Sequence, residues 1–294
     1  MESDSNMQLT DGTYPVDLPV NDYNDLSSNP EEHFSYLDKK KLLNLPQNEQ
    51  MNMNQDNIGL LPLFDDDECT PSLVILHAPG DETQVVAVYL HRKWWSVDEV
   101  LKTSSKFRSG LVVVGSIMER IVLFLMSQIV FGFLERTPGE HLYFSPHPMK
   151  EFAKIFWQDG EAVGFYTIKK KGTLCNRWTG QSYLLPVLDN VFVRMQWRRK
   201  GLALQMLEDF CSSFPKEEVV GLSYPMSASM HEVCRKYLQI HQEQRDRLYE
   251  VESPGDWSQR RNVWLKLQLN HHPTNSEAHE SEQLGSSSNE HCNK

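Results

Sequence analysis

Residues 193–203, VRMQWRRKGLA, join an apolar run to an amphipathic one. Residues 183–194 predict a β-strand, and the apolar side chains that follow the loop recur at helical spacing. Backbone N–H groups at such a turn can face a phosphate, Gly201 allows close backbone approach, and small Ala203 permits tight helix packing. Because Arg198, Arg199 and Lys200 add positive charge, the loop suits a pyrophosphate.

Upstream of this loop, the sequence predicts an antiparallel meander of three strands. Two β-rich runs, residues 152–157 and 162–169, are separated by Asp159-Gly160, which is a strong signal for a two-residue hairpin turn. The strand at residues 183–194 follows them and is expected to pair in sequence order.

Downstream of the loop, helices and strands alternate. A helix is expected from about residue 200 to 214, a strand over 219–224, and a second helix over 227–242. Strands over 248–251 and 263–269 are expected to complete the sheet. One helix therefore crosses between the strand that ends at Arg194 and the next strand, which indicates a mixed α/β sheet.

The region before the meander adds two strands and two helices. Residues 73–77 and 85–91 predict strands joined by a Pro-Gly-Asp turn. Ser96 with Glu99 three residues later predicts the start of a helix over 94–107, and residues 111–134 supply the next helix. The fold class predicted for the whole is α/β, with a mixed central sheet flanked by helices.

Residues 111–134 are almost entirely apolar and bear on a membrane location. The charged pair Glu119 and Arg120 leaves 14 uncharged residues from Ile121 to Leu134, whereas a bilayer needs roughly 20. We therefore predict a buried helix and no transmembrane span. A docking face for a membrane surface or a partner stays open as the alternative.

Composition divides the chain into three parts. Residues 1–58 are polar and acidic and are predicted to form a disordered arm with a brief helix over 37–45. Within this arm, Phe34, Tyr36 and Leu37 could dock on the domain or on another protein. A folded domain is expected over 59–270 and a disordered polar tail over 271–294. The excess of acidic side chains lies in the terminal regions, because residues 69–270 hold 25 basic and 21 acidic side chains. The folded part can therefore receive an anion although the whole chain has a net charge of −11.

The loop motif resembles that of the GCN5-related N-acetyltransferase superfamily, in which a strand is followed by R/Q-x-x-G-x-G/A and a helix. Residues 198–203, RRKGLA, fit this pattern. The resemblance implies that acetyl-coenzyme A binds here, with the backbone amides of residues 199–203 on its pyrophosphate and Val193 on its pantetheine or acetyl carbonyl. The predicted cofactor-binding residues are Val193, Arg198, Arg199, Lys200, Gly201, Leu202 and Ala203.

A second resemblance covers nearly all of residues 60–265 and is to the soluble lamin-associated protein family of vertebrates. It rests on the blocks VVAVYL with WW, GEAVGFY, QSY with LPVLD, and MLEDF. The resemblance implies a nuclear protein, at the nuclear envelope or lamina, whose partner is a lamina or other nuclear protein. A cytoplasmic location is the alternative, because the N-terminus has no signal-peptide pattern and the five cysteines suggest no disulfide framework.

Acetyl transfer from a thioester needs a base for the amine and an acid for the leaving thiolate. Asp189 at the start of the central strand and Glu161 in the adjacent hairpin are the candidate bases, and His231 is a third. In the superfamily the acid is commonly a Tyr on the helix after the fifth strand. Cys234 stands at the matching position, and Tyr237 one turn later is the candidate substitute. Each of these residues also has an ordinary structural interpretation.

Other ligands have weaker support. Arg194, the three basic side chains of residues 198–200 and Trp197 could hold RNA, but a charge of +4 over some 200 residues is a small footprint, so no specific nucleic acid is predicted. No metal site is predicted, because the histidines at residues 271, 272, 279 and 291 lie in the polar tail. Two hypotheses follow: an acetyl-coenzyme A-dependent N-acetyltransferase, and a non-catalytic nuclear interaction module that retains the fold.

Overall fold

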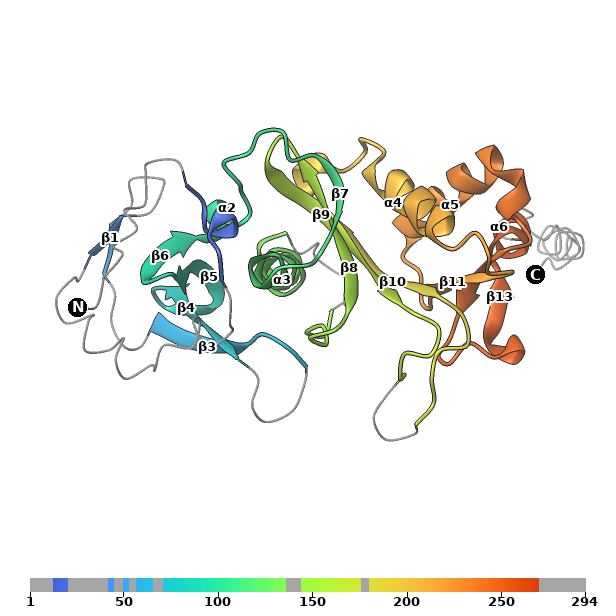
Figure 1. Ribbon diagram of the computed structural model, residues 1–294, viewed down its shortest axis with the longest axis horizontal. Coiled ribbons are helices and arrows are strands. Elements are labelled where there is room, and N and C mark those ends of the chain that lie inside the picture. The colour runs from blue at the N-terminus through green and yellow to red at the C-terminus, as the bar shows by residue number, and fades with distance from the viewer. Residues whose placement is uncertain are drawn as a thin grey trace, which may run out of the picture.

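The structure is a computed structural model, and it describes residues 13–20, 42–44, 50–52, 57–65, 71–135, 144–175 and 180–269. Among them are two β-sheets with helices on their faces (Figure 1). The predicted mixed α/β class is confirmed, and most of the described strands divide between a seven-stranded and a four-stranded sheet instead of forming one central sheet. The predicted boundaries at residues 58 and 270 stay a prediction, and the polar tail lies outside the described residues.

The larger sheet has seven strands. In spatial order they are β13 (Arg260–Asn262), β12 (Leu248–Val251), β11 (Val220–Ser223), β10 (Val187–Val193), β9 (Glu161–Lys169), β8 (Phe152–Gln158) and β7 (Gly110–Val113). Strands β7 to β10 are antiparallel, β10 to β12 are parallel, and β13 is antiparallel to β12. The β8–β9 turn is the one that Asp159-Gly160 predicted, since both residues have the positive φ of a type I′ turn.

Three helices cover one face of this sheet at its β10–β13 end (Figure 1). They are α4 (Leu202–Ser213), α5 (Ala228–Ile240) and α6 (Val263–Leu269). Helix α4 crosses from β10 to β11, as the sequence predicted, and buries Leu207 and Phe210 against Tyr166 and Ile168 of β9 in one apolar cluster. The apolar stripe of α4 thus fixes where its N-terminus lies.

The smaller sheet has four antiparallel strands and lies at the N-terminal end of the molecule (Figure 1). These are β3 (Ile58–Pro62), β4 (Ser72–Ala78), β5 (Asp81–Leu90) and β6 (Lys93–Ser96), followed by α2 (Val97–Val100). Helix α3 (Ile117–Phe124) continues as the π-helix η4 (Leu125–Leu134) and lies between the two sheets. Its apolar side chains join residues of both sheets in one core cluster. A two-stranded hairpin, β1 (Leu42–Asn44) with β2 (Gln50–Asn52), stands apart.

The apolar helix from Ile117 to Leu134 is long and apolar enough to cross a membrane by length and composition. However, 56% of this segment is buried inside the protein, as in the core helix of a globular domain. Its first half contains several side chains with no exposed surface, among them Ile121, Val122 and Leu125. The described residues therefore hold no clear transmembrane span.

Four predicted elements were wrong in extent or type. The helix expected over 94–107 is strand β6, the four-residue α2 and a loop, because the Ser96 cap starts a helix that Thr103 and the serines after it do not extend. Residues 110–113 form β7 and not the start of a helix, since the helix begins at the Ser116 capping box. The strand expected over 263–269 is α6, whose buried residues are Val263 and Leu267 at i and i+4. Of the brief helix expected over 37–45, residues 42–44 are strand β1, and 37–41 and 45 lie outside the described residues.

Within the predicted N-terminal arm, residues 13–20 are packed on the folded domain. They include the 3-10 turn η1 (Pro15–Asp17), which contacts α2 and α3. Pro15 and Val16 are buried, and Val16 belongs to the same core cluster as Val100 and Met118. The arm therefore contributes to the core, which composition alone did not predict. Phe34, Tyr36 and Leu37 lie outside the described residues.

Candidate functional site

Strands β10 and β11 separate after only two paired positions. Val187 pairs with Gly221 and Leu188 with Leu222, after which β11 ends at Ser223 while β10 runs on to Val193. The register of β10 against β9 also shifts between Leu188 and Val191, which marks a bulge at the same level. We call Asp189 and Ser223, the first residues beyond the last pair, the fork. Beyond the fork, the edge of β10 that faces β11 has no strand partner.

The backbone of Val193 faces this open edge. The amide of Arg194 donates to the carbonyl of Val163 on β9 at 2.9 Å. Because pairing alternates along an antiparallel ladder, the amide and carbonyl of Val193 point away from β9. The carbonyl accepts a hydrogen bond from Nε of Arg198 at 3.0 Å. Of the two backbone groups of Val193, the amide is therefore the one that remains available to a ligand at the open edge.

The loop after β10 presents consecutive amides. It consists of the 3-10 turn η5 (Met195–Trp197) and a left-handed stretch in which Arg199 has φ 63° and Gly201 has φ 81°. Within the described part of the chain, the amides of residues 199–204 donate to no partner, and the first bonded amide is that of Gln205, to Gly201 O at 3.1 Å. Six adjacent N–H groups are therefore available at the N-terminus of α4.

The start of α4 differs from that of its neighbours. Helices α2, α3 and α5 each begin after a serine whose hydroxyl accepts from a first-turn amide. Helix α4 begins after Gly201, which has no side chain to do so, and its first turn contains no acidic residue. The positive end of the helix dipole, the unpaired amides and the basic loop thus lie at the same place. Each of them favours an anion.

The loop side chains divide between solvent and core. Arg198, Arg199 and Lys200 are exposed, and Lys200 Nζ lies 4.2 Å from the centre of the Trp197 ring. Trp197 packs against the same cluster as Val193, whereas Met195 is 52% exposed. Met195 therefore lies largely in solvent, whereas Trp197 packs beside Val193.

Arg194, which the RNA interpretation counted as a surface cation, is buried in an ion-pair cluster. Its guanidinium reaches Glu161 at 2.5 Å, Asp98 at 3.4 Å and Glu135 at 3.5 Å. Glu135 also accepts from the amide of Met195. Arg194 therefore anchors the loop to α2 and to the end of η4, and Glu161 is engaged by Arg194 instead of standing free as a base.

Asp189 is the one predicted catalytic residue at the fork. Its Oδ1 accepts from Ser223 Oγ at 2.6 Å, its Oδ2 accepts from Asn190 Nδ2 at 3.0 Å, and Lys169 Nζ lies 3.7 Å away. Lys169 in turn pairs with the buried Glu151 at 2.9 Å. Sequence reasoning missed Ser223, Lys169 and Glu151, because only strand pairing brings them to Asp189 and no motif marks them.

Tyr237 and Cys234 lie elsewhere. Both are buried between α4 and α5, where the Tyr237 hydroxyl bonds the Cys211 thiol near the C-terminal end of α4. Burial, with the nearby thiol, raises the pKa of Tyr237 above its ordinary value, and burial raises that of Cys234. His231 lies on the first turn of α5 with Nδ1 bonded to Ser227 O at 3.0 Å. The structure therefore does not bring the predicted acid and the predicted bases together.

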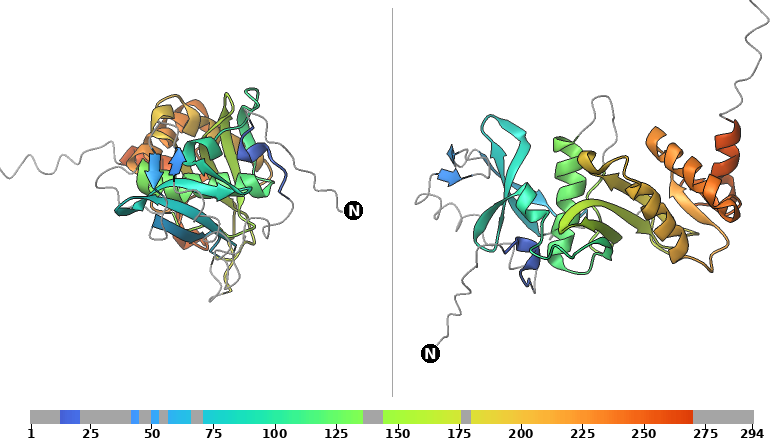
Figure 2. Two further views of the ribbon diagram at one scale, coloured as in Figure 1. Left: turned by 90° about the vertical axis from the view of Figure 1, so that its left-hand side faces the viewer. Right: turned by 90° about the horizontal axis from the view of Figure 1, so that it is seen from above.

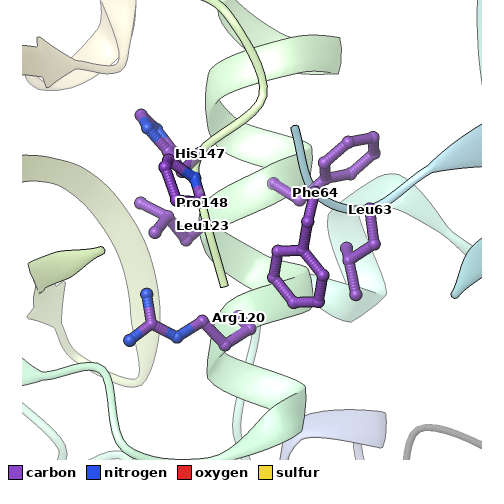
Figure 3. Close-up of a pocket in the computed structure, with 7 residues that line it drawn as sticks. Leu63, Phe64, Arg120, Leu123, His147 and Pro148 are labelled. Atoms are coloured by element: carbon purple, nitrogen blue, oxygen red, sulfur yellow. The ribbon is translucent and has the colours of Figure 1, made fainter. Parts of the chain in front are cut away.

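A separate small cavity lies between α3 and the loop after β3 (Figure 3). It is lined by Leu63, Phe64, Arg120, Leu123, Phe124, His147 and Pro148. Its volume of about 10 Å³ is about what one water molecule needs, so it has no room for an organic ligand. Nε2 of His147 is buried there without a partner among the described residues.

This histidine makes stability depend on pH. Burial, with the charges of Lys169 and Arg120, lowers the pKa of His147 to about 4 from its ordinary 6.5. Between these values the unfolded chain binds the proton and the folded chain does not, so stability falls as pH falls, by up to about 1.4 kcal/mol per pH unit. We expect His147→Gln to remove this part of the slope in urea unfolding between pH 6.5 and pH 4. Parallel curves for the two proteins would contradict a buried neutral His147.

Known proteins that are similar to this chain include the following two relatives. "Protein FAM169B" of Mus musculus is 43% identical over 263 residues, which cover 87% of this chain and 78% of the relative. "Protein FAM169BP" of Homo sapiens is 44% identical over 156 residues, 50% of this chain and 80% of the relative. No family model and no solved structure matches the chain.

Proposed function

The chain belongs to the FAM169B family, and from its loop and fork we propose that it binds acetyl-coenzyme A. The observation that carries the proposal is the run of six unpaired amides at residues 199–204, at the start of a helix and beside the open edge of β10. A pyrophosphate accepts several N–H donors at once, and the helix dipole and basic loop favour its charge.

The order of elements supports the same proposal. Three antiparallel strands, the crossing helix α4, a parallel strand and α5 follow one another as in the acetyltransferase-like fold that the loop motif suggests. The separation of β10 from β11 leaves backbone groups of the Val193 edge for a pantetheine chain. We therefore propose a GCN5-related N-acetyltransferase-like domain, with the phosphates at residues 199–204 and the thioester directed towards the fork.

Calorimetry of the full chain tests the proposal. Titration with acetyl-coenzyme A is expected to give saturable heat, and Ala203→Glu is expected to reduce affinity at least tenfold, because its carboxylate would face the same amides as the pyrophosphate. A carboxylate in the first helical turn stabilises the helix, so folding is expected to be retained. Thermal unfolding of the variant checks this.

Gln205→Glu is the matched control, since it adds the same charge on α4 at an exposed residue whose amide is already bonded. Its affinity is expected to stay close to that of the wild type. Pantetheine, which lacks the phosphates, is expected to bind far more weakly than coenzyme A. Equal loss in the two variants, or no heat from folded wild-type protein at millimolar ligand, would overturn the proposal.

The second candidate function, a non-catalytic nuclear interaction module, has its own supporting observation. Glu161 is ion-paired and Tyr237 is buried away from the fork, so acetyl transfer would rest on Asp189 as the base. Release of coenzyme A thiol from acetyl-coenzyme A in the presence of a panel of primary amines separates the two functions. Release that Asp189→Asn abolishes supports transfer, and binding without release supports the interaction module.

The nuclear location that goes with this second function is also a proposal. It rests on the resemblance to soluble lamin-associated proteins, and the partner proposed is a protein of the lamina. Imaging of the tagged chain with a lamin marker tests it. A uniform cytoplasmic signal would contradict the proposed location and would not bear on cofactor binding.

A further inference from the structure

The packed N-terminal segment, residues 13–20, lies on the domain in the way that a bound peptide does. It pairs with no strand of either sheet and consists of the three-residue turn η1 with extended residues on both sides. Figure 2 shows it as a short dark-blue turn beside the long green helix, α3, and it also contacts α2. Its neighbours on both sides, residues 1–12 and 21–41, lie outside the described part of the chain.

Apolar side chains and one carboxylate hold the segment. Pro15 and Val16 are its buried side chains, and Val16 is 8% exposed within the core cluster that includes Val100 and Met118. Val20 packs against the same cluster from its rim. This is the anchor pattern of a short linear segment, with two adjacent apolar side chains and a polar residue directly after them.

That polar residue, Asp17, has a dedicated set of donors. Its carboxylate accepts from the hydroxyl of Thr103 and, at 2.7 Å, from the amide of Ser104. The Ser104 hydroxyl and the Tyr14 backbone also bond it. Burial alone would raise the pKa of Asp17, but these bonds outweigh it and lower the pKa, although no cation contributes. The amide of Ser104 can only donate, and the two hydroxyls can turn to donate as well, so the set favours a carboxylate, which accepts at both oxygens, over an amide.

From these contacts we propose that α2, α3 and the Thr103–Ser104 turn form a peptide-docking surface. Its ligand is an extended segment of another protein with the pattern Pro-aliphatic-Asp, and residues 15–17 of this chain occupy the surface in cis. The segment is held by side-chain contacts of Pro15, Val16, Val20 and Asp17 and by no strand pairing, and the proposal is that this contact exchanges with the partner. Because the segment is tethered, it competes with the partner at the effective concentration that the tether gives it. The partner must therefore exceed a threshold concentration to displace the segment. This inference is independent of the proposed cofactor site.

A labelled peptide tests the surface in trans. The probe is a fluorescent TYPVDLPV, the sequence of residues 13–20, and the receptor is the full chain carrying Val16→Asp and Asp17→Lys, which together release the cis segment. Fluorescence anisotropy is expected to show saturable binding to this receptor and at least tenfold weaker binding to the wild type, whose surface is occupied. The peptide with Asp17→Asn is expected to bind about tenfold more weakly than the unchanged peptide.

Two further variants make the result specific. Ser104→Glu in the receptor sets a carboxylate against Asp17 and is expected to weaken binding, whereas Ser109→Glu, in the same loop but without a contact to Asp17, is the matched control. If the released receptor fails to fold by circular dichroism, a protease site engineered at residues 21–25 replaces it. The cut wild-type segment is then expected to exchange with the labelled peptide.

Three outcomes would overturn the proposal. The first is equal binding of the unchanged peptide and the peptide with Asp17→Asn, which would remove the carboxylate requirement. The second is a cut segment that stays bound and does not exchange, which would make residues 13–20 a permanent part of the core. The third is concentration-dependent dimerisation of the wild type through swapped segments, which would assign the surface to a second copy of this chain.

Discussion

Arg194→Met is expected to lower the free energy of unfolding by about 3 kcal/mol. The guanidinium is 10% exposed and neutralises Glu161 and Glu135, whose side chains are 23% and 15% exposed. Removing the cation leaves two carboxylates partly buried and unpaired, which costs far more than the ion pair contributes when intact. Urea unfolding followed by circular dichroism measures the loss.

The control for this effect is a surface pair. Arg261 and Glu252 are 57% and 44% exposed and 3.0 Å apart, so Arg261→Met is expected to cost less than about 1 kcal/mol. Because Glu135 also bonds the amide of Met195, the Arg194 variant is expected to loosen the loop and to weaken acetyl-coenzyme A binding as well. Equal losses of stability in the two variants would show that Arg194 does not act as a buried anchor.

Gly164→Ala has the next largest expected effect, a loss of about 2–3 kcal/mol. A Cβ atom at Gly164 would lie 2.6 Å from the carbonyl oxygen of Phe192 and 2.8 Å from Cε of Met206. The first is backbone of β10 and the second belongs to α4, so the methyl group would force the strand or the helix outwards. Thermal or urea unfolding reports the loss.

Gly132→Ala is the matched substitution, because a Cβ there meets no atom within 4 Å and the backbone is not left-handed. It is expected to leave stability unchanged or to raise it by up to about 1 kcal/mol, as alanine does in helices. A stable Gly164→Ala protein would contradict the close packing of α4 on β9, and with it the placement of the loop.

Local chemistry explains which parts of the fold could be predicted. The β8–β9 hairpin follows from two residues that tolerate positive φ, and α4 follows from an apolar stripe of several turns. Two of the failures share one cause, since short apolar runs carry no decisive period. Residues 110–113 and 263–269 are both such runs, and tertiary packing made the first a strand and the second a helix.

The candidate site divides in the same way. The loop at residues 198–203 could be located because basic charge, Gly201 and a following helix are adjacent in sequence. The catalytic candidates could not, because their availability depends on partners that are distant in the chain. Glu161 meets Arg194, Asp189 meets Ser223, and Tyr237 meets Cys211 only once the sheet and the helices have assembled. No feature of the sequence marks these pairings.

We propose that the amides of residues 199–204 hold the phosphates of acetyl-coenzyme A, and nuclear magnetic resonance of the ¹⁵N-labelled full chain tests this amide by amide. On titration with acetyl-coenzyme A, these amides are expected to show the largest saturable shifts. The amides of residues 228–230, at the start of α5 where Ser227 bonds the amide of Met230, are the internal control. Shifts confined to other residues, or equal shifts at the two helix starts, would contradict the claim.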